Sequence, residues 1–369
     1  MREQLLNRGG EPLIIAGPCS VENRAQLEEV VAALRQERRV DMIRCGVWKP
    51  RTRPGGFEGL GEKALQWMEE LSGDTTIFCC EVARPEHVEK CLQHGISCVW
   101  IGARTSGDPF GMGELSESFR GTDLTVLVKN PLIPDVKLWM GALERVMRSG
   151  IKDIGAVHRG FYSYRDNSPY RNKPLWEVPI ELRQLMPGLP ILCDPSHMGG
   201  KREYLQDLMQ TAADLGADGY MIEVHPHPTE ALTDAEQQVT PRELSRQLDS
   251  IIWRRNTADS DSELRNLRKQ IDEIDETLLR TLSQRMEISK KIATLKAKSG
   301  IAVYQPQRLE QMMVQRMQKA EQIGLSPMFV KELLDKVHAE SVKTQEEIVI
   351  QGRNRKQASD DLRRKSDPN

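Results

Sequence analysis

Eight short apolar runs recur through the first part of the chain, and this count constrains the fold more than any other feature. Each run is apolar almost throughout, as expected for a strand buried on both faces. Helix-like segments such as 24–37, 58–72, 135–148 and 200–215 lie between the runs. Eight β/α units in about 250 residues predict a closed (β/α)8 barrel of the TIM type, and a doubly wound open sheet is the alternative. The runs are LIIAG (13–17), MIRCGVW (42–48), TTIFCCEV (75–82), CVWIGA (98–103), TVLVKN (125–130), DIGAVHRG (153–160), PILCDPS (190–196) and GYMIEVHP (219–226).

The composition of the chain changes near residue 255. All six tryptophans, 24 of the 27 glycines and 17 of the 20 prolines precede residue 262. The remainder is rich in Leu, Ile, Met, Lys, Glu and Gln, and the polar stretch RRNTADSDSE between the two parts has the composition of a linker. The sequence therefore predicts a barrel over 1–253, a linker over 254–263, a helical domain over 264–350 and a flexible tail over 351–369.

Charge and cysteine content restrict the class of protein. The net charge of −2, with both signs mixed along the chain, provides no basic field for nucleic acid or an anionic membrane. No apolar run approaches the roughly 20 residues that cross a bilayer, and the first residues lack the apolar core of a secretion signal. The seven cysteines are odd in number and irregularly spaced, which argues against a disulfide framework. We therefore expect a cytoplasmic protein.

Charged or metal-capable side chains stand at or just after the end of every predicted strand. In a closed parallel barrel these ends meet at one rim, where such barrels carry their chemistry. One such residue alone would more often be structural, but their presence at all eight strand ends predicts a single site. They are Cys19 after the first run, Lys49 and Arg51 after the second, Glu81 in the third, Arg104 after the fourth, Lys129 in the fifth, Arg159 in the sixth, His197 after the seventh and Glu223 in the eighth.

The stretch RCGVWKPRTRPGGFEG (44–59) concentrates positive charge. Arg44, Lys49, Arg51 and Arg53 fall within ten residues. Such a run is usually a solvated loop, but here it follows a strand and faces the predicted rim. Its two prolines stiffen the loop, so that less entropy is lost when a ligand binds. From the residues alone, the stretch is either a solvated loop or an anion clamp.

The helical segment has its own polar anomalies. From Leu264 the apolar residues recur at spacings of three and four, which predicts a long amphipathic helix, and further helices begin near Pro306 and Pro327. Arg285 lies on the apolar stripe, where an arginine is costly unless it is paired or meets an anion. Ser341 and Gln345 likewise occupy places that packing alone would make apolar. On periodicity alone, the simplest interpretation is a three-helix dimerisation bundle.

The barrel segment resembles a known family across residues 10–253. Its motifs AGPCS, KPRT, IGART, LVKNP, HRG, DPSHMGGKR and MIEVHPHPTEALTDAEQ occur in barrel order and are similar to those of 3-deoxy-D-arabino-heptulosonate 7-phosphate (DAHP) synthases. The resemblance implies condensation of phosphoenolpyruvate with erythrose 4-phosphate, the first step of the shikimate pathway. It also implies phosphoenolpyruvate ligands (Arg44, Arg104, Lys129, Arg159), erythrose 4-phosphate ligands (Arg51, Thr52), a lysine between the two substrates (Lys49) and ligands for a divalent metal (Cys19, His197, Glu223, Asp234).

The implied catalytic residues of the barrel are Lys49, Lys129 and His197. The mixed sulfur, nitrogen and oxygen donor set suits Mn²⁺ in first place, or Co²⁺, Fe²⁺ or Zn²⁺. The metal would act as a Lewis acid on the aldehyde oxygen of the sugar phosphate. Glu81 is a further candidate, for positioning the attacking water. His225 and His227 are interpreted as loop residues and not as ligands.

The helical segment resembles the all-helical chorismate mutases across residues 264–350, in LRKQIDEIDETLLRTLSQRMEISKKIATLKAK and AESVKTQEE. The resemblance implies an interlocked homodimer in which the partner chain supplies one arginine, Arg268. The chain departs from the family pattern at Gln305, a weaker helix cap, and at Leu309, where a glutamate is usual and Glu310 follows one place later. The implied substrate ligands are Arg268, Arg285, Lys296, Arg308, Ser341 and Gln345, with Lys296 and Gln345 as the catalytic pair that stabilises the breaking ether oxygen.

Together the two resemblances predict a bifunctional enzyme, a transferase and an isomerase, acting on phosphoenolpyruvate, erythrose 4-phosphate and chorismate. Feedback by chorismate or prephenate through the helical domain is part of this expectation. One alternative is a barrel that uses arabinose 5-phosphate, as 3-deoxy-octulosonate 8-phosphate synthases do, although KPRT suits the shorter sugar. The other is a helical module that only senses a ligand and dimerises.

Overall fold

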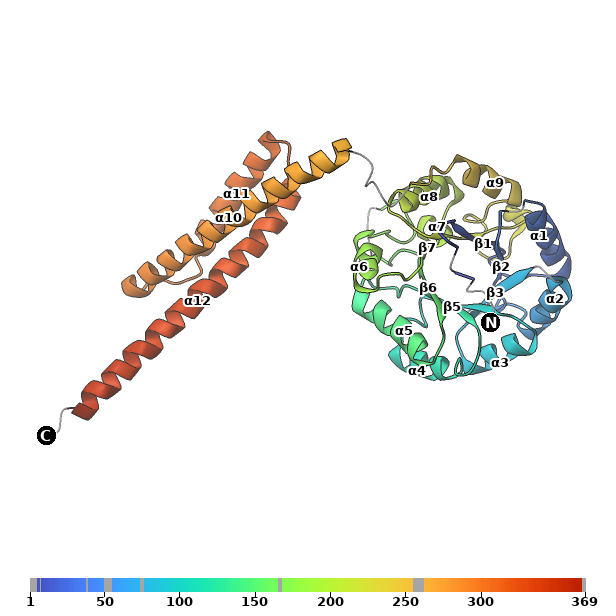
Figure 1. Cartoon of the computed structure of the whole chain (residues 1–369), viewed down its shortest axis with the longest axis horizontal. Coiled ribbons are helices and arrows are strands. Elements are labelled where there is room, and N and C mark those ends of the chain that lie inside the picture. Colours follow the sequence, from blue (N-terminus) through green and yellow to red (C-terminus); the bar gives the residue numbers. More distant parts are fainter. Residues whose placement is uncertain are drawn as a thin grey trace. The chain divides into compact units, whose positions relative to one another are not determined.

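The chain forms two units, Met1–Asn256 and Thr257–Asn369, each with its own internal contacts (Figure 1). The computed structural model describes residues 5–6, 8–37, 39–49, 55–73, 76–164, 168–254 and 262–366, with only the backbone described at 262 and 353–366. The first unit contains the strands, and the described part of the second contains helices joined by short connections.

The strands of the first unit close into a parallel barrel in sequence order (Figure 1). Leu13–Gly17 pairs with the second strand on one side and with the eighth on the other. Every strand lies within one of the predicted apolar runs, so the closed barrel is confirmed and the open sheet is wrong. The strands are β1 (Leu13–Gly17), β2 (Met42–Cys45), β3 (Ile77–Val82), β4 (Cys98–Ile101), β5 (Thr125–Lys129), β6 (Asp153–His158), β7 (Ile191–Cys193) and β8 (Gly219–Glu223).

Helices surround the barrel and cover the outer faces of its strands (Figure 1). Their buried residues recur with helical spacing, as on α1, where Leu27, Val30, Val31 and Leu34 face the strands. The helices are α1 (Arg24–Glu37), α2 (Glu62–Ser72), α3 (Pro85–Gln93), α4 (Pro109–Glu117), α5 (Val136–Arg148), α6 (Glu177–Leu185), α7 (Pro195–Gly199), η1 (Arg202–Tyr204), α8 (Leu205–Asp214), η2 (Pro228–Glu230) and α9 (Pro241–Ser250).

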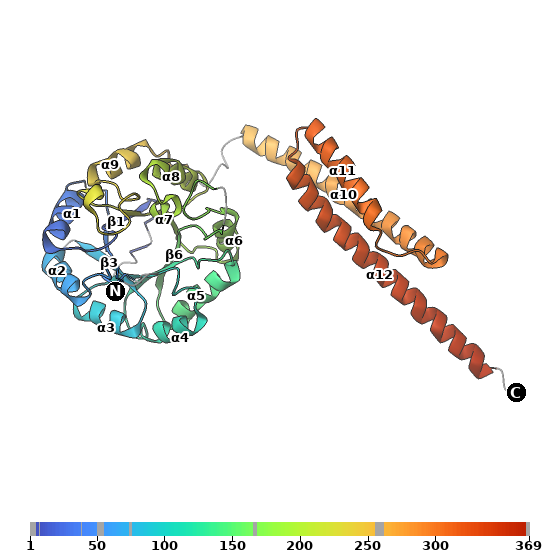
Figure 2. The ribbon, with the colours of Figure 1, turned by 180° about the vertical axis from the view of Figure 1, so that it is seen from behind.

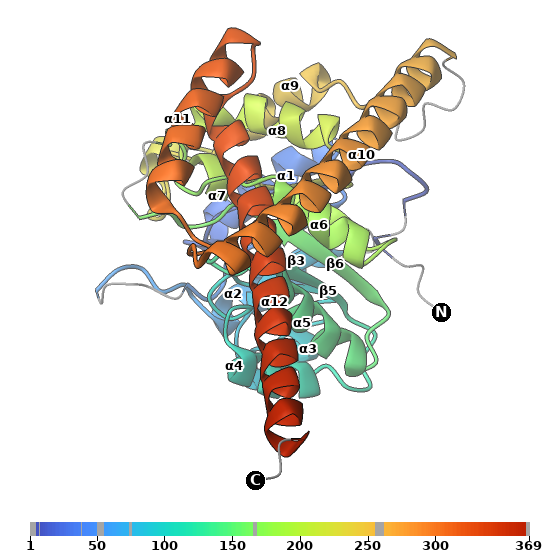
Figure 3. The ribbon, with the colours of Figure 1, turned by 90° about the vertical axis from the view of Figure 1, so that its left-hand side faces the viewer.

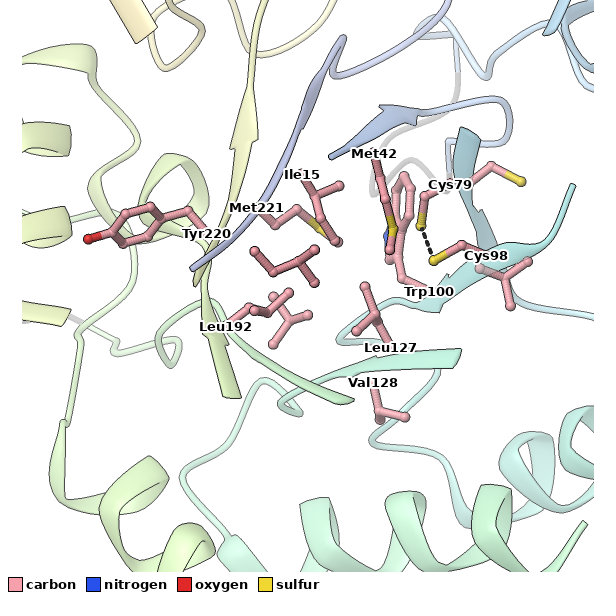
Figure 4. Close-up of a cluster of buried hydrophobic side chains, with 14 of the residues drawn as sticks. Ile15, Met42, Cys79, Cys98, Trp100, Leu127, Val128, Leu192, Tyr220 and Met221 are labelled. Carbon is pink, nitrogen blue, oxygen red and sulfur yellow. Dashed lines mark hydrogen bonds between the residues drawn. The ribbon is translucent and has the colours of Figure 1, made fainter. Parts of the chain in front are cut away.

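Side chains from opposite strands fill the barrel interior (Figure 4). Ile15, Leu127 and Met221 meet inside the ring of strands and are fully buried. Tyr220 points the other way and donates a hydrogen bond from its hydroxyl to the carbonyl of Met209 on α8, at 2.7 Å. This alternation is the two-residue period of a strand that is covered on both faces. The interior is therefore a packed core, and space for ligands lies at the rim.

All seven cysteines lie in the barrel unit as buried free thiols. The Sγ atoms of Cys79 and Cys98 are 3.2 Å apart, as are those of Cys80 and Cys91 (Figure 4 draws the first pair). These separations are hydrogen-bond contacts and exceed the roughly 2.05 Å of a disulfide. Six of the thiols serve as small apolar groups in the core.

The second unit consists of three helices, α10 (Ser262–Ser299), α11 (Pro306–Gln322) and α12 (Pro327–Ser366). Helix α12 packs against both α10 and α11 (Figures 2 and 3). It continues to Ser366 and so includes most of the segment 351–369 expected as a tail; the flexibility of that segment stays a prediction. Among the described helices, α10 and α12 have the length to cross a bilayer, but neither contains the long apolar stretch that crossing requires.

One apolar face of α10 is largely exposed in the described part of the chain. Leu267, Ile271, Ile274 and Leu278 lie on the predicted apolar stripe, yet they are 51, 57, 66 and 47% exposed. Burying such side chains is worth about 1.5–3 kcal/mol each. The three helices of one chain therefore leave a large part of their apolar surface exposed to water.

Candidate active site

The loops that follow β1, β7 and β8 bring together the predicted metal ligands. Donor atoms of Cys19, Glu223 and Asp234 all lie within 4.8 Å of one another. The Sγ of Cys19 is 3.3 Å from Oδ2 of Asp234. His197 stands next to this group, with Nε2 3.7 Å from Oε1 of Glu223. Residues more than 200 positions apart in the sequence thus form one cluster at the rim.

Hydrogen bonds between loops hold Cys19 in this position. Its backbone N–H donates to the side-chain oxygen of Gln238 at 3.1 Å, and the Gln238 amide donates to the carbonyl of Thr233 at 2.8 Å. Ser20 and Thr233 share a hydroxyl hydrogen bond of 2.7 Å. The loop after β1 is therefore tied to the loop after β8. Burial and the nearby Glu223 carboxylate raise the pKa of the Cys19 thiol to about 12, and a bound cation would lower it.

Asp194 links the cluster to the cationic side of the rim. It caps α7, accepting a hydrogen bond from the backbone N–H of His197 at 3.0 Å. Its Oδ2 lies 2.8 Å from Nδ1 of His197 and 2.6 Å from Nζ of Lys129. Burial alone would raise the pKa of this carboxyl, but His197 and Lys129 hold it well below its usual range. Asp194 therefore orients both side chains.

Arg44 and Lys129 both lie near the ring of Trp100 inside the barrel. The Arg44 guanidinium lies 4.9 Å from the ring centre of Trp100 and the Lys129 ammonium 5.8 Å, a cation–π arrangement. The Trp100 indole N–H donates to Glu81 at 3.1 Å. Arg44 also lies 3.1 Å from Glu223, while its Nε and Nη1 have no hydrogen-bond partner among the described residues. Two buried donors of one guanidinium are thus available to an anion.

Lys49 lies against the same cluster. A Cβ at Gly46 would fall 1.9 Å from the carbonyl oxygen of Cys19 and 3.2 Å from Cε of Lys49, so only glycine permits this close approach of the two loops. Burial acts to lower the pKa of the Lys49 ammonium, but Cys19 and Glu223 outweigh it and the pKa is raised. Lys49 is therefore held as a cation beside the predicted metal ligands.

Arg159 and Arg104 extend the positive surface. Arg159 is buried after β6, and its guanidinium donates to the side-chain oxygen of Asn172 at 2.9 Å. Burial, together with the charges of Arg171 and Arg104, lowers its pKa to about 10, so it stays protonated at neutral pH. Arg104 is exposed and lies close enough to take part in this repulsion. Such repulsion between cations is relieved when an anion binds between them.

The remaining predicted barrel residues are placed as follows. Arg51 and Thr52 lie outside the described residues. His225 pairs with Glu22 at 3.7 Å and His227 with Glu29 at 3.4 Å, away from the metal-capable group. Neither histidine belongs to that group.

The helical unit gathers some of its predicted residues between α10 and α12. The Arg285 guanidinium donates to the hydroxyl of Ser341, and the Gln345 amide donates to Ser289 at 2.9 Å. The Gln345 side-chain oxygen is buried without a hydrogen-bond partner in the described part of the chain. Lys296 donates to the carbonyl of Val303 at 2.6 Å.

Arg308 and Arg268 are both exposed. Arg268 precedes Arg285 by 17 residues on the continuous helix α10, which is about 25 Å along the axis. One chain therefore cannot bring these two arginines to the same ligand. The side chain of Gln305 makes no capping hydrogen bond at the start of α11, as expected for a weak cap.

Sequence reasoning missed four residues of the barrel site: Trp100, Arg171, Asp194 and Gln237. The sequence D-P-S-H carries a signal for Asp194, because aspartate before a proline is a common helix start. Arg171 and Gln237 lie in irregular loops and contact the cluster through 2.8 Å and 2.5 Å hydrogen bonds. Gln237 ends the quoted motif MIEVHPHPTEALTDAEQ, but nothing in the sequence shows which carboxylate it or Arg171 contacts.

A closed barrel whose C-terminal rim combines a metal-capable cluster with buried cations defines the class as a TIM-barrel protein with a site for anions. The sequence model of the DAHP synthetase I family matches residues 2–259, and the chain belongs to that family. Residues 267–346 match the chorismate mutase type II model, so a domain of that kind is fused to the barrel.

Individual relatives are similar to parts of the chain. The phospho-2-dehydro-3-deoxyheptonate aldolase of Thermotoga maritima is 33% identical over 226 residues, which is 61% of this chain and 64% of that protein. The chain thus covers slightly less than two thirds of that relative. A crystal structure of the Thermotoga maritima enzyme superposes with a TM-score of 0.59 at 29% identity, covering 66% of this chain and 70% of the other. The T-protein of Enterobacter agglomerans is 35% identical over 80 residues, 22% of this chain and 21% of that protein.

Proposed function

We propose that the barrel condenses phosphoenolpyruvate with erythrose 4-phosphate to form DAHP and inorganic phosphate. The observation that carries the proposal is the meeting of Arg44, Lys49 and Lys129 with the Cys19–Glu223–Asp234 cluster at one rim. The reaction joins two phosphates, a carboxylate and an aldehyde, so its site needs more cations than acids around the substrates. The family membership of the chain supports the same assignment.

The chain's own residues would act by binding and orientation. Arg44, Arg104 and Arg159 would hold the carboxylate and phosphate of phosphoenolpyruvate, because planar guanidinium groups bind both groups with two hydrogen bonds. Lys49 would lie between the substrates, and Lys129, fixed by Asp194, would face the phosphate. The methylene carbon of phosphoenolpyruvate then attacks the aldehyde carbon, and the aldehyde oxygen takes up a proton. Water adds at the carbon that bears the phosphate, and the C–O bond to phosphate breaks. Glu81 is the candidate that positions this water.

A divalent cation fits the residues present. Cys19, His197, Glu223 and Asp234 offer one sulfur, one imidazole nitrogen and two carboxylates, a set suited to Mn²⁺, Fe²⁺, Co²⁺ or Zn²⁺. Oε1 of Glu223 is buried 3.1 Å from Nη2 of Arg44 and accepts no hydrogen bond from the described residues. These four residues would hold the ion, which would supply Lewis-acid polarisation of the aldehyde oxygen.

The test follows phosphate release by the full-length protein given both substrates and Mn²⁺. Lys49→Ala is expected to lower kcat/KM by about 10²–10³-fold, the usual cost of one preorganised electrostatic group. Lys152→Ala is the matched control, because Lys152 is exposed at the opposite end of the barrel, just before β6. A near-normal rate for Lys49→Ala, with the fold intact by circular dichroism, would remove Lys49 from the mechanism.

The competing assignment replaces erythrose 4-phosphate with arabinose 5-phosphate. We infer the shorter sugar from the KPRT motif and from the match to the DAHP synthetase I family. Rates with the two sugars, measured side by side, decide between them. A higher kcat/KM with arabinose 5-phosphate would reverse the assignment.

We further propose that the helical unit rearranges chorismate to prephenate. This reaction needs two carboxylates held in a compact conformer and a donor to the breaking ether oxygen, without acid, base or covalent intermediate. Arg285, Lys296 and Gln345 supply these groups, and the chorismate mutase type II match supports the assignment.

The titration of residue 345 tests this second activity. Glutamine donates a hydrogen bond at any pH, whereas glutamate donates only when protonated, below roughly pH 4–5. Gln345→Glu should therefore lose mutase activity at pH 7 and recover part of it on acidification. A wild-type protein that does not consume chorismate would favour the alternative of a sensing and dimerising module.

A homodimer and feedback through the helical unit complete the proposal. The exposed apolar face of α10 and the 17-residue separation of Arg268 from Arg285 both favour a second copy that covers this face and supplies Arg268. Prephenate or chorismate bound there would inhibit the barrel if it bound two arrangements of the protein with different affinities. Prephenate should then inhibit the condensation in the wild type and not in Arg285→Ala. Equal inhibition of both proteins would contradict this regulatory role.

A further inference from the structure

Asp234 divides its two carboxylate oxygens between the cluster and the loops behind it. Oδ2 lies 3.3 Å from Sγ of Cys19, whereas Oδ1 accepts a hydrogen bond from the Arg171 guanidinium at 2.8 Å. The backbone of Asp234 is left-handed, with φ of +46°, a conformation that non-glycine residues adopt seldom and at a cost. The side chain is thus aimed at Cys19 by a strained backbone and held from behind by Arg171.

Glu223 divides its oxygens in the same way. Oε1 lies 3.1 Å from Nη2 of Arg44 and 3.7 Å from Nε2 of His197, on the side of the cluster. Oε2 accepts a hydrogen bond from the buried amide of Gln237 at 2.5 Å. The oxygen of that amide in turn accepts from Nη1 of Arg171 at 2.8 Å. One guanidinium nitrogen therefore reaches the first carboxylate directly and the second through a single amide.

We propose that Arg171 and Gln237 are positioning residues that fix Asp234 and Glu223 for binding a divalent cation. The proposal rests on the metal site proposed above. By charge alone, an arginine at this place would oppose a cation, because it competes for Asp234 and repels positive charge. Its contribution is therefore geometric: it satisfies the outer oxygens, so that the inner oxygens face the ion. Groups that hold metal ligands in this way typically change metal affinity by 10–100-fold when they are removed.

The test uses the full-length protein, stripped of metal with a chelator and titrated with Co²⁺. Co²⁺ bound to a cysteine thiolate absorbs in the near ultraviolet, and its visible bands report coordination geometry. Arg171→Met and Gln237→Met remove the two hydrogen-bonding groups while keeping side-chain length. Arg202→Met is the matched control, because Arg202 holds the same loop by donating to the carbonyl of Ala235 at 3.2 Å, with no recorded contact to either carboxylate.

We expect Arg171→Met and Gln237→Met to weaken Co²⁺ binding about tenfold or more and to alter the visible bands. Arg202→Met should keep the wild-type spectrum and stay within about twofold in affinity. Far-ultraviolet circular dichroism checks the fold of each variant, and Arg171→Lys and Gln237→Asn replace any variant that does not fold.

Three results would overturn the inference: unchanged affinity and spectra in both variants, tighter Co²⁺ binding by Arg171→Met, or an equal loss in Arg202→Met. Tighter binding would mean that Arg171 only competes with the ion. If the wild-type protein gives no thiolate band with Co²⁺, the proposed metal site itself fails. If the wild type binds normally and the variants match it, only the positioning role fails.

Discussion

The barrel and the helical unit assemble polar residues in different ways. In the barrel, the closed sheet brings residues from eight strands to one rim, and buried charges such as Arg44 and Glu223 offset each other within one chain. In the helical unit, Arg285 and Gln345 meet partners on a neighbouring helix, while the apolar face of α10 stays exposed. A closed sheet thus gathers its polar residues at one rim, whereas the three helices leave part of their apolar surface uncovered.

Metal removal should produce the largest difference between the activities of the two units. Stripping with a chelator is expected to lower the condensation rate by more than about 10³-fold, because a Lewis acid is worth several kcal/mol to the transition state. Chorismate rearrangement in the same sample should not change. Added Mn²⁺ or Co²⁺ should restore the condensation. Full synthase activity after exhaustive stripping would contradict the metal assignment.

Arg285→Ala tests whether the helical unit can lose its activity while the barrel keeps its own. Loss of this half-buried guanidinium should lower mutase kcat/KM by about 10²–10³-fold, because it removes a preorganised carboxylate ligand. The condensation rate without prephenate should stay within about twofold. Arg280→Ala, an exposed arginine on the same helix, is the matched control. Retained mutase activity in Arg285→Ala would remove Arg285 from the proposed mutase site.

Burial of His158 should make the stability of the barrel depend on pH. His158 lies at the end of β6 among Trp139, Phe161 and Trp176, and burial lowers its pKa to about 3. In the unfolded state the imidazole has a pKa near 6.5, so below that pH it is protonated there while it is still neutral in the native state. The free energy of unfolding therefore falls as pH drops from about 6.5 towards 3. At pH 5 the loss is about 2 kcal/mol.

His158→Phe should abolish that part of the pH dependence. Urea denaturation of both proteins at pH 5 and pH 7, followed by tryptophan fluorescence, measures the difference. All six tryptophans precede the helical unit, so the signal reports the barrel. Equal slopes of stability against pH in the two proteins would show that His158 is protonated in the native state.

The smallest effect is expected from mixing two inactive chains. If a dimer site takes Arg285 from one chain and Arg268 from its partner, a mixed dimer of Arg268→Ala and Arg285→Ala contains one intact site. Random exchange of equal amounts should therefore restore about a quarter of wild-type mutase activity. Activity that stays at the level of the separate variants, despite exchange detected by tagged chains, would contradict the shared site.

The sequence was sufficient for the barrel because each strand is buried on both faces. That burial makes the apolar runs continuous, and their count of eight determines the closed topology. Cys19, Lys49 and Glu223 at the rim could be predicted from the sequence, because each follows an apolar run or ends a strand. The motif resemblance then attached roles to them.

The features that the sequence did not predict depend on loop geometry and on packing between helices. Arg171 and Gln237 contribute through hydrogen bonds to Asp234 and Glu223, and neither residue has a spacing that relates it to those partners. The exposed stripe of α10 could be read as amphipathic, but the sequence alone did not show that α11 and α12 leave it uncovered. Periodicity identifies a face and does not identify what covers it.

The distribution of thiols has a practical consequence for measuring the two units. Because every cysteine is buried in the barrel and the helical unit has none, a thiol-reactive dye added under native conditions can modify the protein only when the barrel opens. The labelling rate would therefore report opening of the barrel alone. Melting of the helices would cause no labelling, so opening of the barrel could be timed separately from it in a chain without added cysteines.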